Sequence, residues 1–296
     1  FLSHVLKKIF VNGLSALDLI HKVSDLPKNP EKYKSKSTFI SIGGNAANAS
    51  VALSRLGVKV YLSTIIGKDD IGDILTRKLI SENIDLSYTH FLDNYNTSIS
   101  SIIIDKNGER LVLNNRKFDS LKIKKNIDYE IFDGFLFDSR DTKNSIKILK
   151  EINNIKKPKL LDAEENTTNE LLNYFSHVVF SYQGLKSFTG LEDIKTALMT
   201  FSKRFEFKVF VTNGEHGCYF IKDNILKNIP ALKIKPVDTL AAGDVWHGAF
   251  LLKLVSNTSL KNCIQFANYI ASLKCKKFGG SSGAPFLSEL KENFVL

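Results

Sequence analysis

Strand-like and helix-like segments alternate along most of this chain, and this alternation restricts its fold more than any other feature. Runs rich in β-branched and aromatic residues predict strands, among them "KIFVNGL" (8–14), "DGFLFD" (133–138), "PKLLDA" (158–163) and "HVVFS" (177–181). Helical patterns such as "NSIKILKEINNI" (144–155) separate them. Strands that are joined through helices pair in parallel and bury both faces of the sheet. The sequence therefore predicts an α/β fold with a doubly wound, mostly parallel sheet flanked by helices.

Two segments interrupt the alternation. Residues 14–42 and 95–116 break the pattern, and the second has two β-rich runs on either side of the turn sequence "DKNG" (105–108), which is typical of a hairpin. We expect both segments to form a small β-sheet beside a core made of residues 1–13, 43–94 and 117–296. Such a sheet is either a lid over an active site or an edge extension with a structural or dimer role.

The composition limits the classes of partner. Hydrophobic residues make up 43% of the 296 residues, enough for a sizeable core. The formal net charge of +10 would suit an anionic substrate or a nucleic acid. However, only six of the 41 basic residues are arginines, the residue that most often reads bases, and the lysines are dispersed. We therefore expect no nucleic-acid partner.

The cysteines and the N-terminal stretch bear on location. Cys218, Cys263 and Cys275 lie far apart without metal-binding spacing, which predicts free thiols in a reducing cytosol. The stretch "FLSHVLKKIFVNGL" (1–14) lacks the apolar region of a signal peptide, and no run approaches the ~20 apolar residues that span a membrane. We expect a cytoplasmic protein with no membrane partner.

The stretch "VDTLAAGDVWHGAF" (237–250) follows an expected strand at 230–238 and places an acid after a turn of small residues, where an apolar helix begins. Amides 241–244 would point out of a helix N-terminus, where free N–H groups and the helix dipole bind anions. Asp244 is then either a base that accepts the proton of a hydroxyl attacking a phosphoryl group, or an acid that pairs with the dipole. The spacing alone leaves both open.

Five motifs resemble those of the ribokinase-like (PfkB) carbohydrate kinases, in the same order and spacing from about Ile9 to the C-terminus. They are "GLSALD" (13–18), "GGNAANASVALSRLG" (43–57), "VTNGEHGCYF" (211–220), "DTLAAGD" (238–244) and "KCKKFGGSSGAP" (274–285). The fourth is similar to the family's D-T-x-G-A-G-D motif. The resemblance implies a ribokinase-like, Rossmann-type core with a small β-sheet lid, and an enzyme that uses ATP and Mg²⁺ to phosphorylate a small hydroxylated substrate.

The resemblance also implies roles for individual residues. Asp244 would be the general base, and the anion-hole amides would come from Ala241, Ala242 and Gly243. The sugar would be faced by Asp18, Gly43, Gly44 and Asn48. The ATP-binding residues would be Thr212, Gly214, Gly217, Thr239, Gly243, Gly279 and Gly280. The stretch 274–285 lies where the family has its nucleotide-base and monovalent-cation loops, which points to K⁺ as a further cofactor.

The chain departs from the family pattern at two places. Ala241 stands where glycine is usual; a positive φ there would cost about 1 kcal/mol or more, whereas a negative φ would cost nothing. The family's N-x-x-E, which is linked to hydrated Mg²⁺, is replaced by "SYQG" (181–184). Asp162 is a candidate to hold metal-bound water instead, or it is a strand-end or N-cap acid.

Two further residues are candidates for substrate contacts. Asn114 follows a lid strand, and Arg140 follows a buried core strand, at the edge of the sheet where α/β proteins bind ligands. Arg140 could clamp an anionic substituent of the substrate, or it could form an ion pair with Asp138 or Asp141. This region looks more like the fructokinase and sulfofructose-kinase branch than like ribokinase itself.

The leading hypothesis is an ATP-dependent carbohydrate kinase that acts on a fructose-like or other ketose sugar, or on an anionic sugar derivative. One alternative is a nucleoside kinase of the same family, in which Phe39 or Tyr95 would stack on the base. Another is a catalytically silent sugar- or nucleotide-binding protein, motivated by Ala241 and the absent N-x-x-E. A homodimer through the lid is also expected, because a small sheet has a face and edges to cover.

Overall fold

The computed structural model describes residues 6–116 and 127–291; the predicted core bounds at 1, 117 and 296 lie outside them. An eight-stranded sheet forms the centre, in the order β14-β13-β12-β11-β10-β9-β1-β4, parallel from β4 to β12 and antiparallel at β13 and β14. Its strands are β1 (Lys8–Asn12), β4 (Lys59–Ser63), β9 (Gly134–Asp138), β10 (Lys159–Ala163), β11 (His177–Ser181), β12 (Lys208–Thr212), β13 (Cys218–Lys222) and β14 (Ile225–Ile229). The predicted mostly parallel sheet is confirmed.

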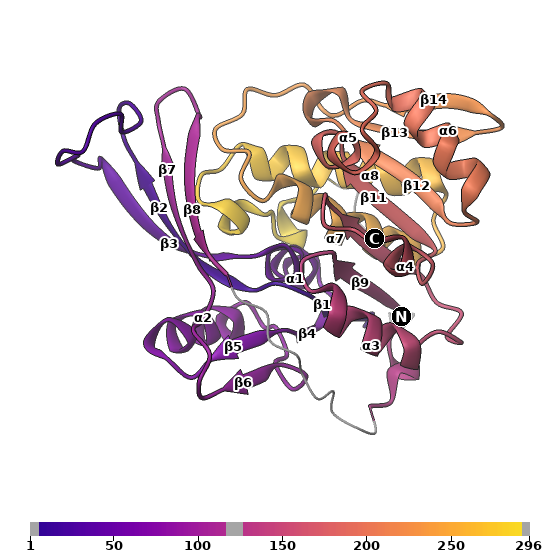
Figure 1. Ribbon diagram of the computed structural model, residues 1–296, viewed down its shortest axis with the longest axis horizontal. Coiled ribbons are helices and arrows are strands. Elements are labelled where there is room, and N and C mark those ends of the chain that lie inside the picture. The colour runs from indigo at the N-terminus through magenta and orange to yellow at the C-terminus, as the bar shows by residue number, and fades with distance from the viewer. Residues whose placement is uncertain (1–5, 117–126, 292–296) are drawn as a thin grey trace.

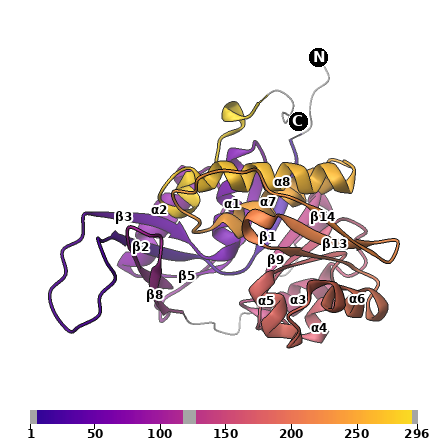
Figure 2. The same cartoon turned by 90° about the horizontal axis from the view of Figure 1, so that it is seen from above.

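Helices cover both faces of this sheet (Figure 2). One face carries α1 (Asn45–Arg55), α7 (Ala242–Val255) and α8 (Leu260–Cys275), and the other carries α3 (Thr142–Glu151), α4 (Asn169–Leu172), α5 (Tyr182–Thr189) and α6 (Ile194–Arg204). Successive strand residues point to opposite faces, so Leu136 of β9 packs in the first core while Phe135 and Phe137 pack in the second. The chain is therefore doubly wound.

A second, four-stranded sheet projects from one side of the core (Figure 1). It contains β2 (Ala16–Lys22), β3 (Ser37–Gly43), β7 (Ile99–Ile104) and β8 (Arg110–Asn115) in the order β3-β2-β7-β8. The turn of the β7–β8 hairpin is held by Asp105, whose Oδ1 accepts hydrogen bonds from the amides of Asn107 and Glu109. We call this small sheet the lid; the sequence pattern predicted it.

The remaining elements are short or lie beside the lid. Helix α2 (Asp70–Ser81) and the two-stranded sheet of β5 (Ile65–Gly67) and β6 (His90–Leu92) lie at the base of the lid, and 3₁₀ turns occur at Tyr129–Ile131, Gly214–His216, Gly280–Gly283 and Leu287–Glu289. Cys218, Cys263 and Cys275 are buried free thiols. No helix in the described ranges 6–116 and 127–291 is both long and apolar enough to cross a membrane.

The expected strand at 230–238 is wrong. These residues have no regular structure, and the strand that pairs with β13 is β14, which ends just before them. Pro230 and Pro236 have no N–H to donate to a ladder. The segment is also largely exposed, so its alternating apolar residues have no sheet to pack against.

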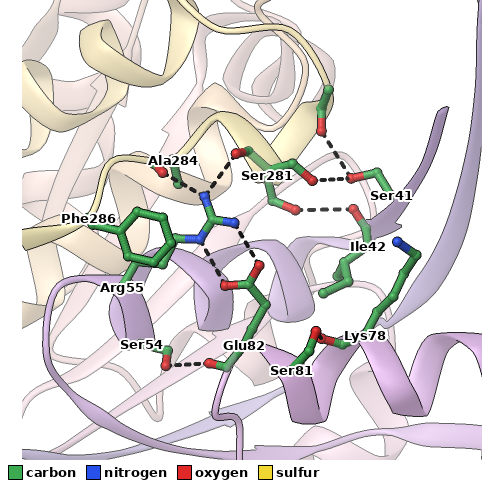
Figure 3. Close-up of polar contacts among 12 residues, drawn as sticks. Ser41, Ile42, Ser54, Arg55, Lys78, Ser81, Glu82, Ser281, Ala284 and Phe286 are labelled. Atoms are coloured by element: carbon green, nitrogen blue, oxygen red, sulfur yellow. Dashed lines mark hydrogen bonds and ion pairs between the residues drawn. The ribbon is translucent and has the colours of Figure 1, made fainter. Parts of the chain in front are cut away.

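Arg55 anchors the loop that follows α8 (Figure 3). Its Nε and Nη2 donate to both carboxylate oxygens of Glu82, and its Nη1 donates to the carbonyls of Ser282 and Ala284, each at 2.8 Å. The guanidinium also lies 4.5 Å from the ring centre of Phe286. A planar guanidinium can make all of these contacts at once, so one side chain of α1 fixes the loop 282–286.

The same loop is attached to the lid. The hydroxyl of Ser41 in β3 donates to the carbonyl of Gly279 at 3.0 Å, and the hydroxyl of Ser281 donates to the carbonyl of Ile42 at 3.2 Å (Figure 3). These side chains are buried. The loop after α8 therefore connects the core to the lid.

Candidate active site

The carboxyl ends of β1 and β9 meet where the sheet reverses its strand order: after β1 the chain adds β4 on one side, and β9 to β12 follow on the other. Ligands of α/β proteins bind at such switch points. Asp138, the buried last residue of β9, accepts hydrogen bonds from the amides of Leu14 at 2.7 Å, Ala46 at 3.2 Å and Arg140 at 3.0 Å. One carboxylate therefore fixes the ends of β1 and β9 and the start of α1.

The loop before α7 has the turn that the small residues predicted. Ala241 adopts φ 62° and ψ 10°, a left-handed conformation, so the positive-φ alternative holds and the residue is strained. The amide of Ala242 donates to the carbonyl of Thr239 at 3.3 Å. At Gly243 a Cβ atom would meet nothing within 4 Å. Of the predicted anion-hole residues, Gly243 thus borders open space, while the amide of Ala242 already has a partner.

Asp244 lies in the first turn of α7, in contact with α1. Its Oδ2 accepts a hydrogen bond from Nδ2 of Asn48 at 2.7 Å, across 196 positions of sequence. Asn48 is buried, and its Oδ1 has no hydrogen-bond partner among the described residues. A buried amide oxygen without a partner is costly, so this atom is available to accept a bond from a ligand hydroxyl.

Negative charge accumulates around Asp244. Burial raises its pKa well above the ordinary value, and the charges of Asp162, Glu164 and Asp138 raise it further, while the hydrogen bond from Asn48 lowers it. Burial likewise raises the pKa of Asp138 to about 7. A carboxylate with a raised pKa accepts a proton more readily, as a general base at neutral pH requires.

Asp162 and Glu164 form a pair at the end of β10. Nδ2 of Asn45 donates to Oδ2 of Asp162 at 2.9 Å and to Oε1 of Glu164 at 3.0 Å. Oδ1 of Asp162 lies 3.5 Å from Nε2 of His247, whose Nδ1 is 2.6 Å from the carbonyl of Gly243. Asp162 is therefore a buried strand residue in contact with α1 and α7, and it is not the N-cap of a helix.

These carboxylates bear on Mg²⁺. In the described parts of the chain, no three His, Cys, Asp or Glu side chains are grouped to hold a metal ion. In phosphoryl-transfer sites, however, Mg²⁺ keeps several waters and is bound by one or two carboxylates together with the substrate phosphates. The adjacent carboxylates of Asp162 and Glu164 fit that role. The "SYQG" segment (181–184) contains no acidic residue and so supplies no carboxylate. Its Ser181 is the N-cap of α5 and accepts a hydrogen bond from the amide of Gly184.

A polar row crosses the lid. Ser41, Asp18, Ser100 and Asn114 are directly paired across β3, β2, β7 and β8, so their side chains lie on one face. A Cβ atom on Gly43 would come within 2.1 Å of the Asp18 carboxylate, so only glycine fits there. Burial raises the pKa of Asp18 to about 6, and the Ser100 hydroxyl and the charge of Arg116 oppose this rise. Asn114, at the outer strand, is exposed.

Gly44 is a second position where only glycine fits. Its φ is 87°, and a Cβ atom would come within 2.4 Å of the carbonyl of Leu14. The residue stands at the N-terminus of α1, immediately after Gly43. The two glycines thus let the lid strand, α1 and the end of β1 come together next to Asp18 and Asn48.

Arg140 forms an ion pair with Glu164, so the two partners expected from sequence, Asp138 and Asp141, are both wrong. Asp141 instead caps α3, and the contact of Arg140 with Asp138 is a hydrogen bond from the backbone amide of Arg140, not from its guanidinium. A second arginine, Arg116, lies close enough to interact electrostatically with Arg140, Glu164 and Asp18, and burial lowers its pKa. Nε of each arginine is buried without a hydrogen-bond partner among the described residues.

The residues expected at the nucleotide fall on separate loops. Thr212 ends β12, and the turn after it contains Gly214 and Gly217, with φ of 49° and 82°. A Cβ atom on Gly217 would come within 2.1 Å of the carbonyl of Ile229, so this turn packs against the end of β14. These positions lie at the carboxyl end of β12.

The other expected nucleotide residues surround Asp238. Thr239 is exposed, as a ligand contact would require. The amides of Gly279 and Gly280 both donate to Oδ2 of Asp238 at 3.0 Å. These two amides therefore hold the protein's own carboxylate, and they fix the position of the loop.

Sequence reasoning missed Asn45, Glu164 and Arg116. Asn45 is one helical turn before Asn48 on α1, and Glu164 follows Asp162 by two positions, which are signals that spacing could have provided. Arg116 belongs to no motif. Of the two aromatics considered for base stacking, Tyr95 is only 4% exposed, and Phe39 packs against Phe278 at 5.1 Å between ring centres.

The strain at Ala241 gives a testable prediction. Ala241→Gly should stabilise the protein by about 0.5–1 kcal/mol, because the gain at a left-handed position exceeds the loss of chain entropy. The matched control is Ala242→Gly, at a right-handed helical position, which should destabilise by a similar amount. Urea denaturation of the two variants checks this; equal effects of the same sign would contradict the strain.

The comparisons with known proteins agree with this architecture. The profile described as "pfkB family carbohydrate kinase" matches residues 6–287. The chain is similar to the ribokinase of Lactococcus lactis, with 28% identity over 96% of both chains, and to the ketohexokinase of Mus musculus, with 25% identity over 91% of this chain and 96% of the relative. Most of the relatives found are named ribokinase, and the fructokinase branch is not singled out.

Solved structures agree as well. A putative ribokinase from Agrobacterium tumefaciens superimposes with a TM-score of 0.91 at 30% identity, covering 98% of this chain and 97% of that one. An Arabidopsis thaliana ribokinase complexed with ribose and ATP superimposes with a TM-score of 0.83 at 22% identity, covering 95% and 96%. With the family profile spanning nearly the whole chain, the protein belongs to the PfkB family of carbohydrate kinases, phosphotransferases that act on an alcohol group.

Proposed function

We propose that the protein transfers the γ-phosphoryl group of ATP to a hydroxyl of a small sugar, with Asp244 as the general base. The main support is the hydrogen bond between Asp244 and Asn48, formed beside the N-terminus of α7. A sugar hydroxyl there would pass its proton to Asp244 as it attacks the phosphorus in line. The amides of Ala241, Gly243 and Asp244 and the helix dipole would stabilise charge on the transferred group.

The same proposal assigns the sugar contacts. Asp18 would accept bonds from hydroxyls, and the free Oδ1 of Asn48 would accept another. The backbone at Gly43 and Gly44 gives the sugar a close approach, since neither position has a side chain. The lid would then cover the sugar and exclude water, which limits transfer of the phosphoryl group to solvent.

The proposal also assigns a role to Mg²⁺. When bound with ATP it would neutralise charge on the phosphates and orient them. Asp162 and Glu164 would hold its waters, because they lie together at the end of β10 and are linked to α1 by Asn45. Their negative charge, which raises the pKa of Asp244, would be compensated by the cation.

The base assignment predicts the effect of Asp244→Asn. The turnover number kcat should fall by about 10²–10⁴-fold, because the amide cannot accept the proton, while ATP binding measured by calorimetry should persist. The control is Asp73→Asn, an exposed acid on α2. A variant that keeps near-normal kcat would show that another group is the base.

The pH profile adds a second readout to this test. A carboxyl group with a raised pKa is protonated on the acidic side of that pKa, so kcat/KM of the wild type should fall as the pH drops through the raised pKa of Asp244 and the pKa of about 6 of Asp18. In Asp244→Asn, the part of the acidic fall in kcat/KM that comes from protonation of Asp244 should be absent. An acidic limb that is unchanged in the variant would mean that it arises elsewhere.

We propose further that the sugar is a ketose-like substrate or carries an anionic group. Support comes from Arg116, whose charge acts on Asp18, and from Arg140 beside it; the Nε of each is buried and has no partner among the described residues. A planar guanidinium binds carboxylate, phosphate or sulfonate oxygens through paired bonds. The ion pair of Arg140 with Glu164 would keep it oriented until such a substrate arrives.

This substrate class is tested with Arg140→Gln on matched neutral and anionic sugars. For an anionic sugar, KM should rise by about 10–100-fold, the loss of one charged hydrogen-bonded contact, with a smaller change in kcat. For a neutral sugar, both constants should change little. Arg77→Gln, on the exposed side of α2, is the control. An equal response of both sugars would remove the anionic group from the proposal.

The lid also supports a homodimer, which we propose as the assembled form. On the lid face opposite Asp18, a row of paired residues includes Ile40, 45% exposed, and Leu113, 64% exposed. A second copy of this face would cover these side chains.

The dimer is tested by light scattering. The wild type should have twice the mass of one chain, and Leu113→Glu should have the mass of one, because a buried charge opposes association. Ile225→Glu, at a 54% exposed position on β14, should remain double. A wild type that is monomeric at micromolar concentration would overturn the dimer.

A further inference from the structure

Lys274 places a positive charge inside the protein, in contact with Asp238 at the start of the loop that leads to α7. The residue is the last but one of α8 and is 0% exposed. Its Nζ donates to the carbonyl of Asp238 at 2.8 Å and lies 3.3 Å from Oδ2 of Asp238. Burial lowers the pKa of Lys274, and the charge of Asp238 opposes this. A buried ammonium persists only where it is paired and hydrogen-bonded, as here.

Asp238 joins two loops of the candidate site. Its Oδ1 accepts the amide of Leu240 at 2.8 Å, which directly precedes the turn at Ala241. Its Oδ2 accepts the amides of Gly279 and Gly280. Asp238 is only 6% exposed, and a buried carboxylate is stabilised by a positive partner in contact with it. Lys274 is that partner.

The stretch 274–285 is where the family resemblance implies a loop that binds a monovalent cation. Such a cation would neutralise a carboxylate at the junction of these loops. In this chain an ammonium, which carries the same single charge, already touches Asp238 from below. A second positive ion against the same carboxylate would be repelled at short range in a buried setting. The residues present therefore do not fit an added K⁺ ion.

We propose that the ammonium of Lys274 is a built-in monovalent cation, which pairs with Asp238 and holds the loops 238–243 and 279–280 in place. The kinase then needs no K⁺, because the charge is supplied covalently by α8. Lys274 is a positioning residue: it acts on the anion-hole loop through Asp238 and contacts neither sugar nor nucleotide. The consequence for catalysis rests on the proposed function, but the consequence for cation binding does not.

The first arm of the test uses the wild-type protein. The protein is prepared free of K⁺, and KCl replaces choline chloride from 0 to about 150 mM at constant ionic strength, which holds general screening fixed. The melting temperature and the rate of sugar phosphorylation should both stay flat. A several-fold rise in rate, or a clear rise in melting temperature with KCl, would overturn the proposal by showing a separate K⁺ site.

The second arm removes the built-in charge with Lys274→Met, which keeps the length of the side chain. In choline chloride the variant should lose at least about tenfold in rate and melt earlier, and KCl should restore both, because the vacated space beside Asp238 then accepts K⁺. NaCl should restore less if the space keeps the size of an ammonium. A folded variant that does not respond to KCl in either readout would overturn the proposal.

Two controls make the outcomes distinct. Lys276→Met removes an exposed lysine two residues further on and should respond to KCl as the wild type does. If Lys274→Met fails to fold in both salts, Lys274→Gln takes its place, and the wild-type arm decides the matter by itself. If no sugar is phosphorylated at all, the proposed function fails, while the melting temperatures still decide whether Lys274 replaces K⁺.

Discussion

The buried carboxylate of Asp138 is the contact on which the arrangement of the site depends. It accepts hydrogen bonds from the amides of Leu14 and Arg140, in the loops that follow β1 and β9, and of Ala46 in the first turn of α1, all at the switch point of the sheet. Backbone amides that end strands and begin helices have no partner within their own element, and they must be satisfied if they are buried. One side chain meets this need for all three, and so sets where the lid strands leave the core.

The buried carboxylate of Asp138 also adds negative charge close to Asp244. Burial raises the pKa of Asp244, and the nearby charges of Asp162, Glu164 and Asp138 raise it further. The protein offsets part of the charge with the ion pair of Arg140 and Glu164 and with the N-termini of α1 and α7. The remainder raises the pKa of Asp244, as the proposed base requires, and would favour the proposed Mg²⁺ ion. Asp138 therefore both holds the loops of the site together and contributes to the raised pKa of Asp244.

Much of the fold and part of the candidate site could be predicted from the sequence. The alternation of strands and helices, the hairpin around residues 105–108 and the turn before Asp244 are local patterns, and the structure confirms them. The strand expected at 230–238 does not form, because Pro230 and Pro236 have no N–H to donate to a strand ladder. The pairs Arg140–Glu164 and Lys274–Asp238 could not be foreseen, because each joins elements far apart in the chain whose meeting depends on the whole fold.

The lid is coupled to the loop that carries the anion-hole residues. Ile20 and Ile102 of the lid pack with Leu240 and Phe278, on the same face as Asp18. Leu240 in turn is held by Asp238, and the 279–284 loop is held by Ser41 of the lid and by Arg55 of the core. A movement of the lid would therefore disturb Leu240 and the turn before α7. Under the proposed function, closure of the lid and alignment of the amides before α7 would be coupled, because both depend on the contacts of Leu240.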